Sequence, residues 1–80
     1  MAPRLPQVSG EALVALLRRL GYQVARQRGS HIQLTKTTAS GEHRITVPDH
    51  KTIAKGTLND ILSKVSLWAG IPKEDILRQI

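Results

Sequence analysis

Apolar residues recur at intervals of three and four near the start of the chain, a spacing that gathers side chains on one face of an α-helix. That face consists of Ala12, Leu13, Leu16, Leu17 and Leu20. Ser9 precedes it as a suitable N-cap, Glu11 lies in the first turn, and Gly21 follows as a C-terminal stop. The pattern therefore predicts a helix that begins after Ser9 and ends before Gly21.

Beyond this helix the period changes to two, which is typical of strands that bury one face. The alternating stretches are Tyr22–Ala25, His31–Thr35 and Arg44–Val47, joined by Gly29-Ser30 and by a polar turn from Thr37 to Glu42, and ended by Pro48. Arg26 and Arg28 would share the face of Val24, which predicts a β-bulge or fraying near Arg26, or a short sheet on which these arginines lie beyond the rim of the core. The short turns predict an antiparallel meander with one apolar face and one basic and polar face.

A second amphipathic helix is predicted after a loop from Asp49 to Gly56. Thr57 and Asp60, three residues apart, resemble a capping box at its start, and Gly70 ends it. Its apolar positions are Leu58, Ile61, Leu62, Val65 and Trp68 or Ala69. A short last helix follows Ile71-Pro72, and its apolar residues can return to the core; they are Ile76, Leu77 and Ile80.

The predicted order is helix, three strands, helix, helix, with no repeat or linker between them. We therefore expect a single α+β domain over residues 1–80, with the helices packed on one face of an antiparallel sheet. The chain contains one Tyr, one Trp and no Phe, and both aromatic residues, Tyr22 and Trp68, are expected to face the core. Recognition of nucleic acid by stacking bases on exposed aromatic rings is therefore not expected.

Composition narrows the function classes. The chain has 80 residues and no cysteine, which excludes disulfides, thiolate catalysis and zinc sites built on sulfur. A domain of this size buries only about 60% of its unfolded surface, so a large cofactor pocket is not expected. The Leu-rich stretch is far shorter than the roughly 20 apolar residues of a membrane span. We therefore expect a soluble cytoplasmic protein without a cofactor or a membrane partner.

The positive charge is concentrated in the middle of the chain. Twelve Lys and Arg stand against six Asp and Glu, a formal net charge of +6. No acidic residue lies between Glu11 and Glu42, and Asp60, Glu74 and Asp75 fall near predicted helix starts, where the helix dipole accounts for them. The excess favours a polyphosphate partner such as RNA over a membrane, although composition alone also allows a merely soluble basic surface.

His31 is the strongest candidate for chemistry. By alternation its side chain faces solvent, away from Ile32 and Leu34, and its neighbours in sequence and across the sheet are Arg26, Arg28, Gln33 and Arg44. Imidazole exchanges protons near neutral pH, and cations would attract a phosphodiester and stabilise its transition state. RNA supplies its own nucleophile, the 2′-hydroxyl, so one histidine in a cationic groove is sufficient without a metal. The alternative is that a lone exposed histidine is only a surface residue.

The other two histidines have weaker signals. His43 shares the strand parity of Ile45 and Val47, which favours a place at the rim of the core. His50, beside Lys51 in a loop, is either solvated or a phosphate contact. No pair at helical spacing and no carboxylate partner supports a three-histidine metal site, so no metal ligand is predicted.

Several short strings resemble the HicA family of mRNA interferase toxins. They are Leu20-Gly21-Tyr22, Arg28-Gly29-Ser30-His31-Ile32, Val47-Pro48-Asp49-His50-Lys51 and Lys55-Gly56-Thr57-Leu58, followed by Ile61-Leu62 and Ala69-Gly70-Ile71. The resemblance runs from about Val8 to Leu77. It implies a double-stranded-RNA-binding-like fold, ribosome-independent cleavage of mRNA without a metal, and neutralisation by a HicB-type antitoxin.

The resemblance also implies roles for single residues. The catalytic histidine of the family's Gly-Ser-His motif falls on His31, with Gly29 and Ser30 as the turn before it. His50 and Lys51 match a His-Lys pair expected to contact RNA. The chain departs from the family pattern at Ser63–Trp68, which adds about one helical turn.

We therefore predict an endoribonuclease in which His31 acts as a general base on the 2′-hydroxyl or as a general acid to the leaving oxygen. The predicted RNA-binding residues are Arg26, Arg28, Gly29, Ser30, Lys36, Arg44, His50, Lys51 and Lys55. Two alternatives remain open at this point. One is a non-catalytic module that binds double-stranded RNA through the same basic face, and the other is a basic face that docks an acidic protein partner.

Overall fold

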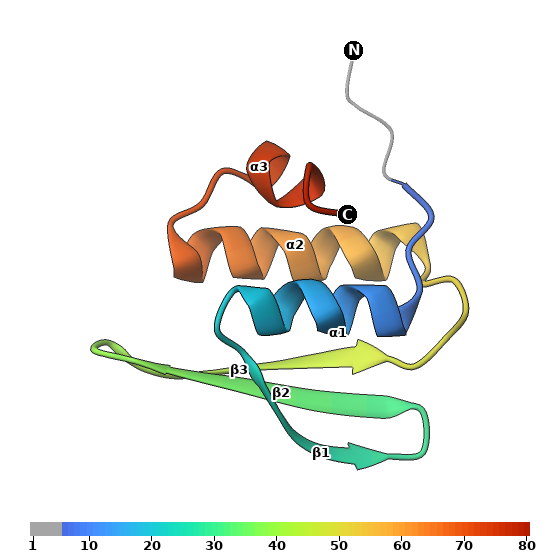
Figure 1. The fold of residues 1–80 in the computed structure, drawn as a ribbon, viewed down its shortest axis with the longest axis horizontal. Coiled ribbons are helices and arrows are strands. Elements are labelled where there is room, and N and C mark those ends of the chain that lie inside the picture. Colours follow the sequence, from blue (N-terminus) through green and yellow to red (C-terminus); the bar gives the residue numbers. More distant parts are fainter. Residues whose placement is uncertain (1–5) are drawn as a thin grey trace.

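The computed structural model describes residues 6–80, and the first five positions of the predicted domain lie outside the described residues. Its elements are α1 (Gly10–Arg19), β1 (Gln23–Arg28), β2 (His31–Thr38), β3 (Gly41–Pro48), α2 (Lys55–Ala69) and α3 (Lys73–Leu77). Figure 1 shows α1 and α2 stacked above one face of the sheet, with α3 beyond α2. The predicted α+β class and the order of helix, three strands and two helices are confirmed.

The sheet is an antiparallel meander with β2 in the centre. The pairing of β2 with β3 is continuous from His31 opposite Pro48 to Thr38 opposite Gly41. Strands β2 and β3 are thus longer than predicted. The residues at the two ends of the expected polar turn pair with each other, and only Ala39-Ser40 remain in the turn. The register of β1 shifts between Val24 and Arg26, which confirms the predicted bulge.

The core lies between the sheet and the helices. Its buried side chains come from every element except β1, and they include Leu13, Leu16, Leu17, Tyr22, Ile32, Leu34, Ile45, Val47, Leu58, Ile61, Leu62, Val65 and Ile76. Ser9 caps α1 as predicted, since its hydroxyl accepts a hydrogen bond from the Ala12 N–H at 3.0 Å. Among residues 6–80, no helix covers the opposite face of the sheet (Figure 1). That face is therefore available to a ligand.

The predicted start of the second helix is wrong. Helix α2 begins at Lys55 rather than Thr57, and its N-cap Ala54 offers no side-chain cap. The chain turns earlier because Ile53 is buried and its N–H donates to the Val8 carbonyl at 2.8 Å. Asp60 therefore lies beyond the first turn, where it pairs with Lys64 at 3.1 Å instead of capping the helix.

Three apolar residues expected in the core are not buried. Val24 is 46% exposed because β1 is an edge strand whose six residues are all exposed. Ile80 is 41% exposed because α3 ends at Leu77, before the chain can return to the core. Ala12 is exposed as well, on the side of α1 away from the sheet, and the half-buried Val14 packs against the core instead.

Candidate active site

His31 is the first residue of β2 and lies at one end of the central strand. It pairs with Arg28 of β1 on one side and with Pro48 of β3 on the other, and it is exposed. Residues directly opposite each other in an antiparallel pair project to the same face of the sheet. The guanidinium of Arg28 and the imidazole of His31 therefore share the face that no helix covers.

The turn before His31 is held by contacts from both sides. Gly29 has a φ of +56°, a left-handed conformation that glycine adopts without steric cost. The side-chain amide of Gln27 donates to the Gly29 carbonyl at 3.1 Å and to the Asp49 carboxylate at 3.3 Å. The Asp49 N–H in turn donates to the Ser30 carbonyl at 2.6 Å. The backbone at His31 is thus fixed, although the imidazole is exposed.

The loop after β3 lies against this turn and is itself anchored. The Gly10 N–H donates to the His50 carbonyl at 2.9 Å. Gly10 is buried so tightly that an added Cβ would lie 2.2 Å from the Pro48 carbonyl oxygen. His50 and Lys51 are both exposed. The loop therefore presents an imidazole and an ammonium group from a fixed backbone beside the turn that holds His31.

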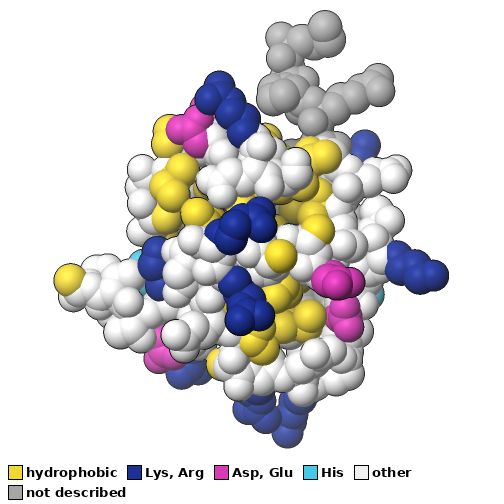
Figure 2. Space-filling view, in the orientation of Figure 1, with side chains coloured by type: hydrophobic (Ala, Val, Ile, Leu, Met, Phe, Trp, Pro, Cys, Tyr) yellow, Lys and Arg dark blue, Asp and Glu magenta, His cyan; other side chains and the backbone are white. Residues whose placement is uncertain are grey.

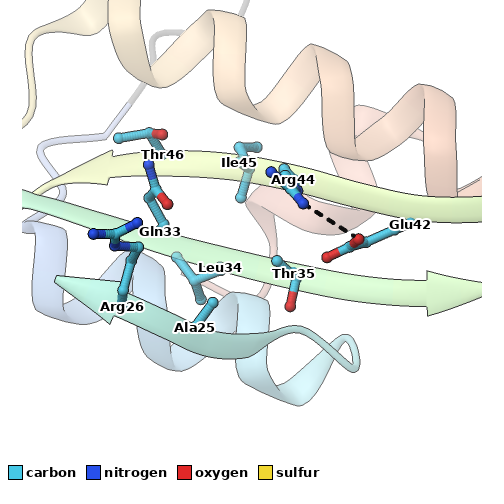
Figure 3. A pocket seen from close by; sticks show the side chains of 9 residues that line it. All are labelled: Ala25, Arg26, Gln33, Leu34, Thr35, Glu42, Arg44, Ile45 and Thr46. Carbon is cyan, nitrogen blue, oxygen red and sulfur yellow. Dashed lines mark ion pairs between the residues drawn. The ribbon is translucent and has the colours of Figure 1, made fainter.

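The middle of the uncovered face is hollowed. Figure 3 shows Arg26, Gln33 and Thr46 on three adjacent strands, with Arg44 nearby. These residues line a hollow of about 430 Å³. Arg44 forms an ion pair of 3.6 Å with Glu42, and both side chains are exposed. Two guanidinium groups thus flank amide and hydroxyl groups on a surface that continues from His31 along the sheet.

Two of the lysines predicted to contact RNA, Lys36 and Lys55, differ from the prediction in position or in bonding. Lys36 belongs to the helix-facing side of β2, where its ammonium donates to the Leu20 carbonyl at 2.8 Å and lies 5.7 Å from the centre of the Tyr22 ring. The structure does not bring Lys36 together with His31. Lys55, expected in a loop, is the first residue of α2 and is exposed, in the helical layer on the side of the molecule where the loop from β3 arrives (Figure 1). In Figure 2 other Lys and Arg side chains project both from the lower side, where the sheet lies, and from the helices.

The aromatic residues are placed partly as predicted. Tyr22 is buried, and this burial raises the pKa of its phenol. Trp68 is only half-buried, and its ring stacks on His43 with the centroids 4.9 Å apart and the planes tilted by 33°. His43 is itself half-buried, in agreement with the predicted place at the core rim. His43 is therefore occupied by packing, unlike His31 and His50.

Some residues that shape the site were not predicted. Gln27 and Asp49 connect the turn to the loop, and Gly10 lets the loop approach α1. Alternation along a strand says nothing of a contact between segments 22 residues apart, so the sequence offered no sign of the pair. Within residues 6–80, no three His, Asp or Glu side chains form a cluster suited to a metal ion.

No helix in the described part of the chain is long and apolar enough to cross a membrane.

A family profile described as "HicA toxin of bacterial toxin-antitoxin" matches residues 10–67. The match includes the whole sheet, both segments of the candidate site and most of α2. Comparison with curated proteins and with solved structures gives no match.

Proposed function

Because this chain belongs to the HicA family of toxins from bacterial toxin–antitoxin systems, we propose that it is a metal-independent endoribonuclease that cleaves mRNA with His31 as the catalytic residue. The observation that supports this most directly is the exposed imidazole at the end of the central strand, on a fixed backbone and beside Arg28. A proton acceptor next to a cation is what cleavage of a phosphodiester by its own 2′-hydroxyl requires.

In the proposed reaction His31 accepts the proton of the 2′-hydroxyl. The 2′-oxygen forms a bond to phosphorus, and the bond from phosphorus to the 5′-oxygen of the next nucleotide breaks. The leaving 5′-oxygen takes up one proton, so the products are a 2′,3′-cyclic phosphate and a 5′-hydroxyl. Arg28 is placed to stabilise the negative charge that grows on the phosphoryl oxygens, because it is the partner of His31 on the same face.

We assign the remaining RNA contacts to the uncovered face and to the end of the sheet. The side chains are Arg26 and Arg44 on the face, and His50, Lys51 and Lys55 at the end, with Gly29 and Ser30 offering backbone groups. Lys36 is left out of this set, since its ammonium is bonded to Leu20 on the helix side. A cationic surface of this kind binds through phosphates, which agrees with the absence of aromatic residues from the face among residues 6–80.

We further propose that the protein acts in the cytoplasm, where mRNA is found, and that a HicB-type antitoxin neutralises it. Family membership supports a protein partner of the antitoxin kind. An acidic protein bound over the basic face would exclude RNA by occupying the same charges.

The test compares His31→Ala with His43→Gln, two substitutions of a histidine on the same sheet. Wild type and the two variants are induced in cells and also purified, and growth, transcript integrity and cleavage of RNA in chelator are measured. His31→Ala should lower the cleavage rate by about 10²- to 10⁴-fold, the usual contribution of a general base, and should abolish growth arrest. His43→Gln should keep both activities.

The fold of each variant is checked by circular dichroism. Exposed substitutions of this kind usually change stability by no more than about 0.5 kcal/mol, so His31→Ala should remain folded. Cleavage by folded His31→Ala at the wild-type rate would refute the assignment. Salt-dependent binding of duplex RNA without any cleavage by the wild type would instead identify a binding module.

A further inference from the structure

A second exposed histidine lies beside the first. We propose that His50 is the general acid of the same reaction and gives a proton to the leaving 5′-oxygen while His31 takes one from the 2′-hydroxyl. This inference rests on the proposed function and deepens it. It assigns to His50 a proton-transfer role in place of a general contact with RNA.

The backbone connection brings the two histidines within reach of one phosphodiester. The hydrogen bond from the Asp49 N–H to the Ser30 carbonyl joins the residues that directly precede them. With its length of 2.6 Å and standard covalent dimensions, the Cα atoms of His31 and His50 are at most about 10 Å apart. When the Cα atoms of two histidines are this far apart, side chains turned toward a phosphate between them can meet its attacking oxygen with one imidazole and its leaving oxygen with the other.

The position of His50 is fixed by contacts that do not use its side chain. Its carbonyl accepts the Gly10 N–H, and three residues later Ile53 is buried and bonded to Val8. Among the described residues, the imidazoles of His31 and His50 form no hydrogen bond with other side chains or with the backbone. The backbone hydrogen bonds of the loop thus hold His50 in place, and its imidazole ring is free to contact a ligand, as expected of a group that transfers a proton.

The neighbouring groups are poorer proton donors. A lysine ammonium gives up a proton at neutral pH far less readily than an imidazolium does. The Asp49 carboxylate already accepts a hydrogen bond from Gln27. Imidazole is the side chain whose two protonation states both exist near pH 7. His50 is therefore the group at this end of the sheet best suited to act as the acid.

The proposed step is balanced. The 2′-hydroxyl gives its proton to neutral His31 and its oxygen binds phosphorus. The electron pair of the broken bond goes to the 5′-oxygen, which takes the proton of the His50 imidazolium. The two histidines end in exchanged protonation states, and proton exchange with water restores them. No co-reactant is needed.

The experiment uses a leaving group that needs no acid. The site that the wild type cleaves in a short RNA is mapped first. Two oligonucleotides are then made, one with the natural 5′-oxygen at that site and one with a bridging 5′-sulfur, which departs as a thiolate without protonation. Cleavage of both is measured for wild type, His50→Ala, Lys51→Ala and His31→Ala.

His50→Ala should cleave the oxygen substrate about 10²- to 10⁴-fold more slowly than the wild type, and the sulfur substrate within a few-fold of the wild-type rate. Lys51→Ala, the matched control from the same loop, should lose equal factors on both substrates. His31→Ala should stay slow on both, because the sulfur does not replace the base. Circular dichroism and His50→Gln, which keeps a polar side chain, check that the loop is intact.

Equal losses of His50→Ala on the two substrates would overturn the proposal and leave His50 as an RNA contact. An unchanged rate on the oxygen substrate would overturn it too, as would rescue of His31→Ala by sulfur, which would reverse the roles. These results differ from failure of the proposed function, in which the wild type cleaves neither substrate.

Discussion

The two turns that bracket β2 are alike in length but differ in what holds them. Gly29-Ser30 is held by a neighbour, the Gln27 amide, and also from a distant segment, by the Asp49 N–H of the loop after β3. Ala39-Ser40 at the other end is held by its own neighbours, since the Thr38 hydroxyl bonds to the Ser40 hydroxyl at 2.9 Å and to the Gly41 carbonyl at 3.2 Å. Of these two turns, the one beside His31 is thus the one that a distant segment holds by a backbone hydrogen bond.

The histidines near the two turns differ in the same way. His31 is exposed beside the externally held turn, whereas His43, two residues into β3, is half-buried against Trp68. A proton-transferring group requires both a fixed backbone and an accessible ring, and only the first end offers this combination. If His31 transfers a proton as proposed, the hydrogen bonds between turn and loop position it as well as stabilising the sheet.

The largest change in stability should follow a substitution at the anchored end. In Gly10→Ala, the added Cβ would lie 2.2 Å from the Pro48 carbonyl oxygen and 3.0 Å from the Asp49 Cα, and both are backbone atoms that cannot rotate away. Overpacking of this kind costs typically 1 to 3 kcal/mol. We expect a lower free energy of unfolding in urea and, at temperatures where the variant is still folded, slower RNA cleavage.

The matched control for this experiment is Gly56→Ala in the first turn of α2, where a Cβ meets nothing within 4 Å. That variant should keep wild-type stability or gain slightly, because alanine is a better helix former than glycine. If Gly10→Ala cleaves RNA as fast as the wild type, the anchoring of the loop is unimportant for the site.

A second pair of substitutions, one in each turn, tests directly whether the two turns differ in their importance for activity. Gly29 has a φ of +56° and Gly41 a φ of +125°, with open space around both. Alanine at position 29 can adopt the left-handed region at a cost of about 1 kcal/mol, whereas a φ near +125° is disfavoured more strongly for any residue with a Cβ. Gly41→Ala should therefore lose more stability, by about 1 to 3 kcal/mol.

Activity should follow the opposite order. Gly29→Ala strains the turn that leads into His31 and should slow RNA cleavage more than Gly41→Ala does, although it is the more stable variant. Urea unfolding and the cleavage rate are measured on the same preparations. Equal activities, or activities that simply track stability, would show that the two turns matter only for folding.

The sequence predicts the type and order of the helices and strands better than it predicts the residues at which they begin and end. Helix α1 and the order of the strands follow from strong apolar periodicity, and Ser9 and Gly21 mark the limits of α1 by local chemistry. The false capping box at Thr57 shows why boundaries are harder to predict. A contact between Ile53 and Val8, 45 positions apart, starts α2 early, and local pattern contains no information on such contacts.

The candidate site was predicted in the same uneven way. Alternation placed His31 on the uncovered face, since it depends only on the parity of β2. The same parity places Lys36 on the helix side, with Ile32 and Leu34 and away from His31. The proximity of His50 to His31 could not be predicted, because it depends on how the loop after β3 folds back onto the turn.

The smallest expected effect concerns charge at one end and in the middle of the uncovered face. Arg28 lies beside His31, whereas Arg44, towards the other end, is partly neutralised by Glu42 at 3.6 Å. Each arginine that contacts a phosphate adds about one counterion to those released on binding, so its removal lowers the salt slope of log affinity by about 1. In a His31→Ala background that prevents cleavage, Arg28→Ala should lower the slope by close to this amount and Arg44→Ala by less.

Lys36→Ala is the control and should leave the slope unchanged, because its ammonium is engaged with Leu20 on the other face. Equal slopes for Arg28→Ala and Arg44→Ala would mean that RNA contacts the whole face evenly, and a lower slope for Lys36→Ala would place the RNA on the helical side of the sheet.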